Sequence, residues 1–191
     1  MKKRVNRIAI THCKYAVEFS DATTVKRLIT AGADVSVVYS CGCKLLTKAC
    51  ESGTDASDKV RYLLQCDASL VNELNCTGAT PLANAAASDN ADVINVLIEY
   101  GADVSRGKIS IIDGISVVDR PVLHYACENG SVSCIHALVA HGADVEAIDR
   151  EFESTPLHLA VGYGHTDCAK ILLEHYSASV SAVDKFGQTE S

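Results

Sequence analysis

The chain contains no tryptophan, one methionine and three prolines, and aromatic residues make up only 5% of its 191 residues. This scarcity argues against one large core filled by ring systems. Apolar residues still account for 48% of the chain, which is ample for a folded domain of this length. Small aliphatic side chains dominate that share, and they suit thin layers between stacked helices.

Positive charge is also scarce, since 17 Lys and Arg residues face 24 Asp and Glu residues and leave a net charge of −7. Such a balance disfavours nonspecific binding to nucleic acid or to anionic membranes. The basic residues that do cluster, within 1–14, are interpreted as a solvated terminus, with contact to an acidic partner as the alternative. We therefore expect no nucleic-acid partner.

No apolar run approaches the ~20 residues that cross a bilayer, and residues 5–10 are too short and polar for the core of a signal peptide. We expect no membrane partner and a cytoplasmic or nuclear location. Nine cysteines, an odd number without a secretory signal, indicate reduced thiols rather than a disulfide scaffold. Since paired ligand spacing such as C-x2-C is absent, we expect no metal and no cofactor.

The segment Gly-Ala-Asp-Val occurs three times, at 32–35, 101–104 and 142–145, each time after an apolar stretch with helical spacing. A tetrapeptide that returns in one local setting predicts a chain built from copies of one unit. Alanines in a shared context recur at intervals of 33, 36, 41 and 34 residues, and these are Ala16, Ala49, Ala85, Ala126 and Ala160. A base period of about 33 residues with two insertions accounts for them.

The last complete unit reads Thr155-Pro-Leu-His-Leu-Ala160 followed by Gly164-His165, and the one before it reads Pro121-Val-Leu-His-Tyr-Ala126. These motifs, with the closing Gly-Ala-Asp, resemble the ankyrin repeat, and about five repeats run from Ile10 to Thr189. The resemblance implies an all-α repeat solenoid, in which helix-turn-helix units are joined by β-hairpin fingers.

The resemblance divides a single domain, 1–191, into units at about 1–38, 39–74, 75–115, 116–148 and 149–183. The first unit is expected to cap the array, and 184–191 resembles the start of an incomplete sixth unit. Two interpretations of this end remain: either the polar tail caps the array, or the chain is a fragment of a longer protein, which we favour. The first unit lacks the Thr-Pro-Leu-His motif, and Lys44-Leu-Leu-Thr47 replaces it in the second.

Local residue chemistry agrees with this division. Pro81 and Pro156 are expected in the first turn of a helix, each after a threonine N-cap. Gly101 and Gly142 are expected to end second helices in a left-handed conformation. Between the third and fourth units, β-branched residues flank Asp113-Gly114 and predict an extended hairpin over 106–119.

Two histidines, His124 and His158, are candidates for a catalytic base, but in the ankyrin repeat this side chain hydrogen-bonds to the finger backbone, and we expect that structural role. Cys50, Cys127, Cys134 and Cys168 fall at interior helical positions. Cys41, Cys43 and Cys76 fall on finger tips, where an exposed thiol can be oxidised. They leave open the alternative of a thiol-dependent or redox-sensitive enzyme or sensor.

The favoured function is a non-catalytic interaction module or adaptor, monomeric alone. In this architecture the finger tips and first helices line a concave face, which is largely preformed. Aromatic and acidic residues at variable positions there predict a partner protein with a basic contact patch. The predicted contact residues are Tyr125, Glu128, Asn129, Arg150, Glu151, Phe152, Tyr163, Glu18, Phe19, Glu51, Ile111 and Ile112.

Overall fold

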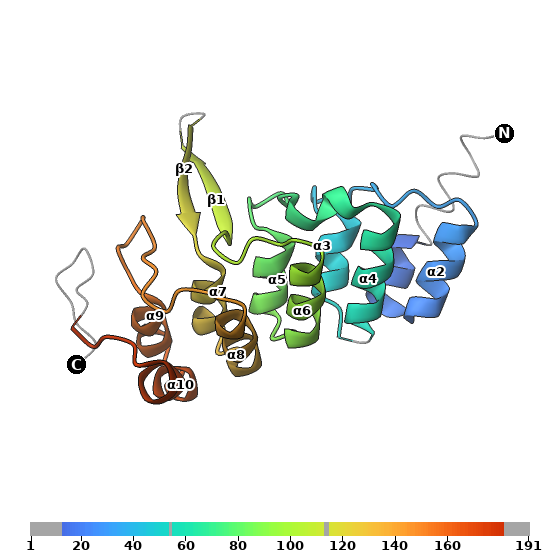
Figure 1. Ribbon diagram of the computed structural model, residues 1–191. Helices are drawn as coiled ribbons and strands as arrows, with labels where there is room; N and C mark the ends of the chain where they lie inside the picture. Colours follow the sequence, from blue (N-terminus) through green and yellow to red (C-terminus); the bar gives the residue numbers. More distant parts are fainter. Residues whose placement is uncertain (1–12, 54, 113–114, 182–191) are drawn as a thin grey trace.

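The computed structural model describes residues 13–53, 55–112 and 115–181. The helices lie in two rows along an extended array, from α2 at one end to α9 and α10 at the other, and a two-stranded hairpin stands off the array between α5 and α7 (Figure 1). One row holds the first helix of each unit: residues 13–19, α3 (Leu45–Cys50), α5 (Pro81–Ala87), α7 (Val122–Glu128) and α9 (Pro156–Gly162). The other row holds α2 (Ala22–Thr30), α4 (Ala56–Cys66), α6 (Ala91–Glu99), α8 (Val132–Ala140) and α10 (Thr166–Tyr176).

From the second unit to the fifth, each first helix packs on the second helix of its own unit, and both pack on their counterparts in the adjoining units. A short 3-10 helix, η1 (Ala68–Asn72), follows α4. Every substantial contact between the described elements joins neighbours in this order, so the two ends of the array do not meet. The predicted all-α repeat solenoid is confirmed.

The core is a set of thin layers between neighbouring units rather than one central mass. Each layer carries a leucine with no solvent exposure, and these are Leu63, Leu97, Leu138 and Leu172 on the second helices and Leu45 on a first helix. Alanines without exposure, Ala49, Ala85, Ala126 and Ala160, let the first helices approach one another. No unit buries its apolar faces alone, because each layer is completed by the next unit.

The Gly-Ala-Asp-Val segments end the second helices, and each residue of the motif has a separate task. The glycines take a positive φ, 89° at Gly101 and 88° at Gly142, which allows the helix to stop in a left-handed turn. The alanine that follows is buried, and the valine is half-buried against the core. The aspartate Oδ1 accepts the backbone N–H two residues later at 2.9 Å in all three copies, Asp34, Asp103 and Asp144.

The helix starts also follow the predicted chemistry. Pro81 and Pro156 each occupy the first turn, and the side chains of Thr80 and Thr155 accept hydrogen bonds from the backbone N–H three residues on. In α9 the cap is reciprocal, because the ring of His158 also accepts the N–H of Thr155 at 3.1 Å.

The loops that lead from each second helix to the next first helix are called fingers here: 31–44, 67–80, 100–121 and 141–155. The third finger carries the insertion as an antiparallel hairpin of β1 (Lys108–Ile112) and β2 (Ile115–Arg120), paired from Lys108 with Arg120 to Ile112 with Ile115. A register shift between Ser110 and Ile111 bends it. The predicted turn residues Asp113 and Gly114 lie outside the described residues.

Gly107 joins the base of this hairpin to the array. Its N–H donates to the carbonyl of Arg120 at 2.7 Å, and its own carbonyl accepts from the N–H of Thr80 at 2.8 Å. A Cβ on this glycine would lie 2.3 Å from the Arg120 oxygen and 2.9 Å from the ring of Tyr125. Only a residue without a side chain fits this close approach.

The layered core predicts that two adjacent leucines of α10 differ strongly in the stability lost when each is replaced by alanine. Leu172 has no solvent exposure, whereas Leu173 is 38% exposed. We expect Leu172→Ala to lower the free energy of unfolding by ~2–5 kcal/mol, and Leu138→Ala to act likewise, because each leaves a cavity. Leu173→Ala should cost less than about 1 kcal/mol. Denaturant unfolding measures the costs, and hydrogen exchange should show the greatest loss of protection near the altered unit; a uniform loss along the chain would contradict neighbour-only coupling.

The hairpin base gives a second prediction. Gly107→Ala should destabilise the protein by ~1–3 kcal/mol, because the backbone of residues 107 and 120 must separate to admit a methyl group. Gly162→Ala is the matched control, since a Cβ there meets nothing within 4 Å and the residue lies in α9. This control should be neutral or stabilising by up to about 1 kcal/mol. Equal effects of the two substitutions on the melting temperature would show that the close approach at Gly107 is not required.

Candidate interaction surface

The exposed side chains of the first helices and of the fingers form one surface, expected above to be the concave face, and we call it the finger face. It carries most of the large apolar side chains that the array leaves in solvent. Of the eight such side chains among the described residues, six lie on it: Tyr15, Phe19, Val38, Ile148, Val161 and Tyr163. The other two are Leu173 on α10 and Val180.

An aromatic pair stands at the N-terminal end of the finger face. Tyr15 and Phe19, one turn apart on the helical residues 13–19, are 64% and 68% exposed, and their ring centroids lie 5.0 Å apart. Of the predicted contact residues, Phe19 and the half-buried Glu18 fall here. The neighbouring Tyr39 donates its hydroxyl to the Lys14 carbonyl at 3.1 Å, and burial together with the charge of Glu18 raises the pKa of Tyr39.

Glu51, predicted to meet a basic partner, is already paired inside the chain. Its Oε2 lies 2.7 Å from the Nζ of Lys48, three residues earlier at the end of α3. The pairing raises the pKa of Lys48, with the hydrogen bond to Glu51 as the largest cause. Because both groups are partly exposed, this pair contributes little to stability, but it removes negative charge from the finger face.

Arg120 is the centre of a charge cluster that joins the fourth and fifth units. Its Nε donates to Oδ2 of Asp149 at 2.6 Å, and its Nη1 donates to Oε2 of Glu128 at 2.8 Å. The guanidinium carbon lies 5.6 Å from the centroid of the Tyr125 ring. The side chain of Asp149 is only 2% exposed, and those of Arg120 and Glu128 are 19% and 25% exposed.

The electrostatics of this cluster favour its charged forms. Burial by itself would raise the pKa of Asp149, but hydrogen bonds from the Phe152 N–H and from Arg120 outweigh it, so that the pKa is lowered. Burial likewise opposes the charge on Arg120, and the two carboxylates overcome it and raise its pKa. The hydrogen bond and negative charge of Glu128 also raise the pKa of Tyr163. Arg120 and Asp149 therefore stay ionised near neutral pH, and Tyr163 stays neutral.

This cluster changes the expected role of two predicted contact residues. Tyr125 was expected as an exposed anchor, but it is half-buried against Arg120, and burial raises its pKa. Glu128 was expected to present free negative charge, and Arg120 neutralises it. Asn129 is exposed, and its Nδ2 donates to the carbonyl of Tyr125 at 2.9 Å, where it ends α7. Tyr163, which ends α9, remains 57% exposed.

Sequence reasoning missed Arg120 and Asp149, although a signal was present. Lys44 occupies the place of the capping threonine in the second unit, and Arg120 directly precedes that place, which Pro121 takes in the fourth. Each basic residue pairs with an acidic residue 29 positions later, Arg120 with Asp149 and Lys44 with Glu73. A base at or just before the cap position, followed by an acid at this interval, identifies an ion pair between adjacent fingers.

The tip of the fourth finger is ordered by Asp149. Its Oδ1 accepts the backbone N–H groups of Glu151 at 2.7 Å and Phe152 at 3.0 Å. The predicted contact residues Arg150 and Glu151 are exposed here, whereas Phe152 is only partly so. Glu153 adopts a positive φ of 54°. Ile111 and Ile112 lie in β1, and their side chains are outside the described part of the chain, as are residues 1–12 and 182–191.

The two motif histidines are structural in this arrangement. The ring Nε2 of His124 lies 2.8 Å from the carbonyl of Ser154, so it donates to the fourth finger, and the other ring nitrogen is buried without a hydrogen-bond partner. His158 caps its own helix through Thr155. His165 reaches back to the Glu128 carbonyl at 2.9 Å. We see no nucleophile activated by a base in these contacts.

The cysteines divide as predicted into buried and exposed groups. Cys50, Cys127, Cys134 and Cys168 are buried, and burial raises the pKa of each thiol, to about 12 for Cys134. Cys41 and Cys76 are exposed and Cys43 is partly exposed. Within the described ranges, no three His, Cys, Asp or Glu side chains are arranged to hold a metal ion.

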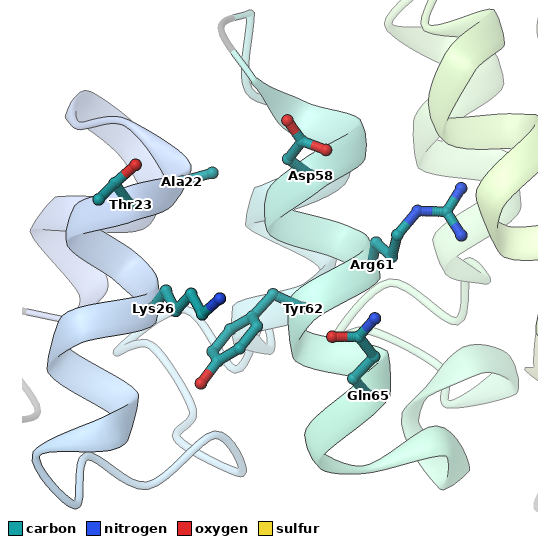
Figure 2. Close-up of a pocket in the computed structure, with 7 residues that line it drawn as sticks. All are labelled: Ala22, Thr23, Lys26, Asp58, Arg61, Tyr62 and Gln65. Carbon is teal, nitrogen blue, oxygen red and sulfur yellow. The ribbon is translucent and has the colours of Figure 1, made fainter.

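On the opposite side of the array, the second helices α2 and α4 enclose a hollow of about 250 Å³ (Figure 2). It is lined by Ala22, Thr23, Lys26, Asp58, Arg61, Tyr62 and Gln65. Lys26 lies over the ring of Tyr62, 5.6 Å from its centroid, and Arg61 pairs with Glu99 at 2.7 Å. Both basic side chains of the hollow are thus engaged within the protein. None of the described helices is long and apolar enough to cross a bilayer.

The buried ring of His124 predicts a pH dependence. Burial lowers its pKa from 6.5 to about 4, because a proton on the unpartnered nitrogen would be a charge without an acceptor. Below pH 6.5 the unfolded chain binds a proton that the folded protein does not, so the free energy of unfolding should fall as the pH drops from 6.5 toward 4. The fall attributable to His124 is about 3 kcal/mol at most.

Denaturant unfolding across this pH range, with His124→Gln and the exposed His175→Gln compared, measures that contribution. His124→Gln should flatten the dependence of the free energy of unfolding on pH between pH 6.5 and 4. His175→Gln should leave this dependence nearly unchanged. If wild type and His124→Gln lose stability in parallel, the ring is not the group that titrates.

The family model for ankyrin repeats matches residues 14–108 and 111–187. Among curated proteins, an E3 ubiquitin-protein ligase of Arabidopsis thaliana, KEG, is 34% identical over 70% of this chain and 8% of its own length. Ankyrin repeat protein nuc-2 of Neurospora crassa is 30% identical over 67% of this chain and 11% of its own. The nuclear factor NF-kappa-B p105 subunit of Gallus gallus is 27% identical over 87% of this chain and 16% of its own.

The chain thus spans less than a fifth of the length of each of these relatives, so it is similar to their repeat segments rather than to the whole proteins. Ankyrin repeats are generally non-catalytic modules of protein–protein interaction. The matched residues include helices of all five units, the threonine caps of α5 and α9 and the Gly-Ala-Asp-Val turns. This chain belongs to the ankyrin-repeat family.

Proposed function

We propose that the chain is a protein-binding module that takes its partner on the finger face, with exposed aromatic side chains as the main contacts. The observation that carries this is the distribution of exposed large apolar side chains, of which six of the eight among the described residues lie on one surface. Solvated apolar groups do not help the array to fold, and aromatic residues are enriched among residues that dominate protein interfaces.

The contacting pair of Tyr15 and Phe19 is the strongest anchor in this proposal. It offers two large rings in fixed contact at one end of the finger face, and Tyr163 offers a third near the other end. Rings already held by a helix lose little freedom on binding, so more of their contact energy appears as affinity. The partner would therefore be a protein with apolar pockets or an apolar ridge.

The acidic side chains of the finger face contribute less to the proposed binding than the sequence suggested. Glu51 and Glu128 are paired with Lys48 and Arg120, so a basic patch on the partner would have to compete with these intramolecular pairs. Glu18 and the exposed Glu153 are the acidic side chains that basic groups of the partner would contact in this proposal. Such contacts would affect association rate and salt dependence more than affinity.

An adaptor role, a monomeric state and a cytoplasmic or nuclear location are parts of the same proposal. The nine thiols are free in the structure, in keeping with a reducing compartment. Ubiquitin ligation, named for the Arabidopsis relative, is not carried over, because this chain spans 8% of that protein. The alternative of a thiol enzyme has no support from the geometry around the histidines.

Affinity capture with mass spectrometry followed by titration of the purified partner tests the proposal. Two double variants are compared with wild type: Tyr15→Ala with Phe19→Ala on the finger face, and Lys26→Ala with Gln65→Ala beside the outer hollow. Tyr163→Ala is tested separately.

We expect the finger-face double variant to raise Kd at least ~10-fold, as loss of interface anchors does, and the outer variant to leave Kd within about 2-fold. Circular dichroism verifies that each variant is folded. Loss of binding by the outer variant alone, with the finger-face variant unaffected, would place the interaction on the second helices and refute the proposal.

A further inference from the structure

Three cysteines meet where the tips of two adjacent fingers touch. Cys41 and Cys43 lie on the first finger, and Cys76 lies on the second. The Sγ atoms of Cys43 and Cys76 are 3.1 Å apart. The two fingers also approach closely at Gly42, because a Cβ on this glycine would lie 2.9 Å from the Cβ of Cys76.

The second and third units lack the histidine tie that holds the fingers farther along. In the fourth unit His124 donates to the finger carbonyl of Ser154. At the matching motif position the second unit has Thr47 and the third has Ala83. These side chains are too short to reach a carbonyl of the finger as His124 does. The sulfur contact thus lies at a place in the repeat where the usual tie is missing.

We propose that Cys43 and Cys76 are a site of thiol modification, at which a low-molecular-weight disulfide such as glutathione disulfide oxidises the pair to a disulfide that joins the two finger tips. The site needs only a small displacement, since the sulfurs close from 3.1 Å to the ~2.05 Å of the bond. The other thiols with any exposure are Cys41, in the same cluster, and Cys66, at the end of α4.

The exchange proceeds in two displacements. The Cys76 thiolate, which is exposed, attacks one sulfur of the small disulfide; a mixed disulfide forms on Cys76 and one small thiolate leaves. The Cys43 thiolate then attacks the Cys76 sulfur and expels the second small thiolate. The two protein thiols lose two electrons, the small disulfide gains them as two thiols, and the protons of Cys43 and Cys76 pass to the thiolates.

The surroundings of Cys43 make the second displacement follow the first. Its hydrogen bond with Cys76 and, to a smaller extent, its burial raise the pKa of Cys43 to about 12. Cys43 therefore stays protonated and does not attack the small disulfide itself. Conversion of Cys76 into a mixed disulfide removes the first of these causes. Hydrogen bonds from the backbone N–H and the thiol of Cys43 lower the pKa of the neighbouring Cys41. Cys41 is therefore placed to accept the Cys43 proton.

The test uses the full chain with all thiols reduced, incubated with glutathione disulfide at neutral pH. We expect two of the nine thiols to disappear and a non-reduced tryptic map to link the peptide 28–44, which contains Cys41 and Cys43, to the peptide 62–106, which contains Cys66 and Cys76. Cys43→Ser and Cys76→Ser should each abolish the link. Cys66→Ser should retain it, and Cys41→Ser should retain it while the mixed disulfide on Cys76 persists longer.

Hydrogen exchange supplies a readout in the folded protein. Oxidation should increase protection in residues 37–44 and 73–80, and it should leave the fourth finger, 141–155, unchanged. A link that survives in Cys43→Ser, oxidation that ends at a mixed disulfide, or a link that appears only in denaturant would each overturn the proposal. None of these outcomes bears on the finger face as a binding surface, since the aromatic variants keep all cysteines.

Discussion

Burial that only a neighbour can complete is the constraint on which this molecule depends. Leucines such as Leu97 and Leu138 are fully buried although they belong to units of about 33 residues, because the adjoining unit supplies the other half of each layer. Stability must therefore pass from unit to unit. One surface of each first helix is left without a structural task, and the finger face is that surface.

The helical layers do not extend to the finger tips, so other contacts join adjacent fingers there. Here the chain uses directed polar ties: His124 to the Ser154 carbonyl, Arg120 to Asp149, and Lys44 to Glu73. A nearly buried carboxylate such as Asp149 is stable only because the guanidinium and two backbone N–H groups satisfy it. The ties make the finger face a preformed surface, and they withdraw their own side chains from binding.

The repeat, the caps and the turns could be predicted from sequence because each rests on local chemistry. A proline directly after a threonine favours the first turn of a helix, as at Pro81, and a glycine after an apolar helix favours a left-handed end, as at Gly142. The pairing of Arg120 with Glu128 was missed for a different reason: it depends on how the strand that ends at Arg120 meets α7, which no local motif specifies. The half-buried position of Tyr125 follows from that pairing, so it escaped prediction as well.

These observations together indicate where new function can arise in such an array. In the fourth and fifth units the motif is nearly complete, and its polar side chains are occupied by caps and ties. The first two units depart from the motif, and there Tyr15, Phe19 and Cys41 stand exposed on the surface. A unit that keeps its leucines but loses its motif residues can still stack, because the layers do not depend on the finger tips. Selection on the first two units is thus free to act on surface chemistry, provided that the buried leucines and alanines of the layers are retained.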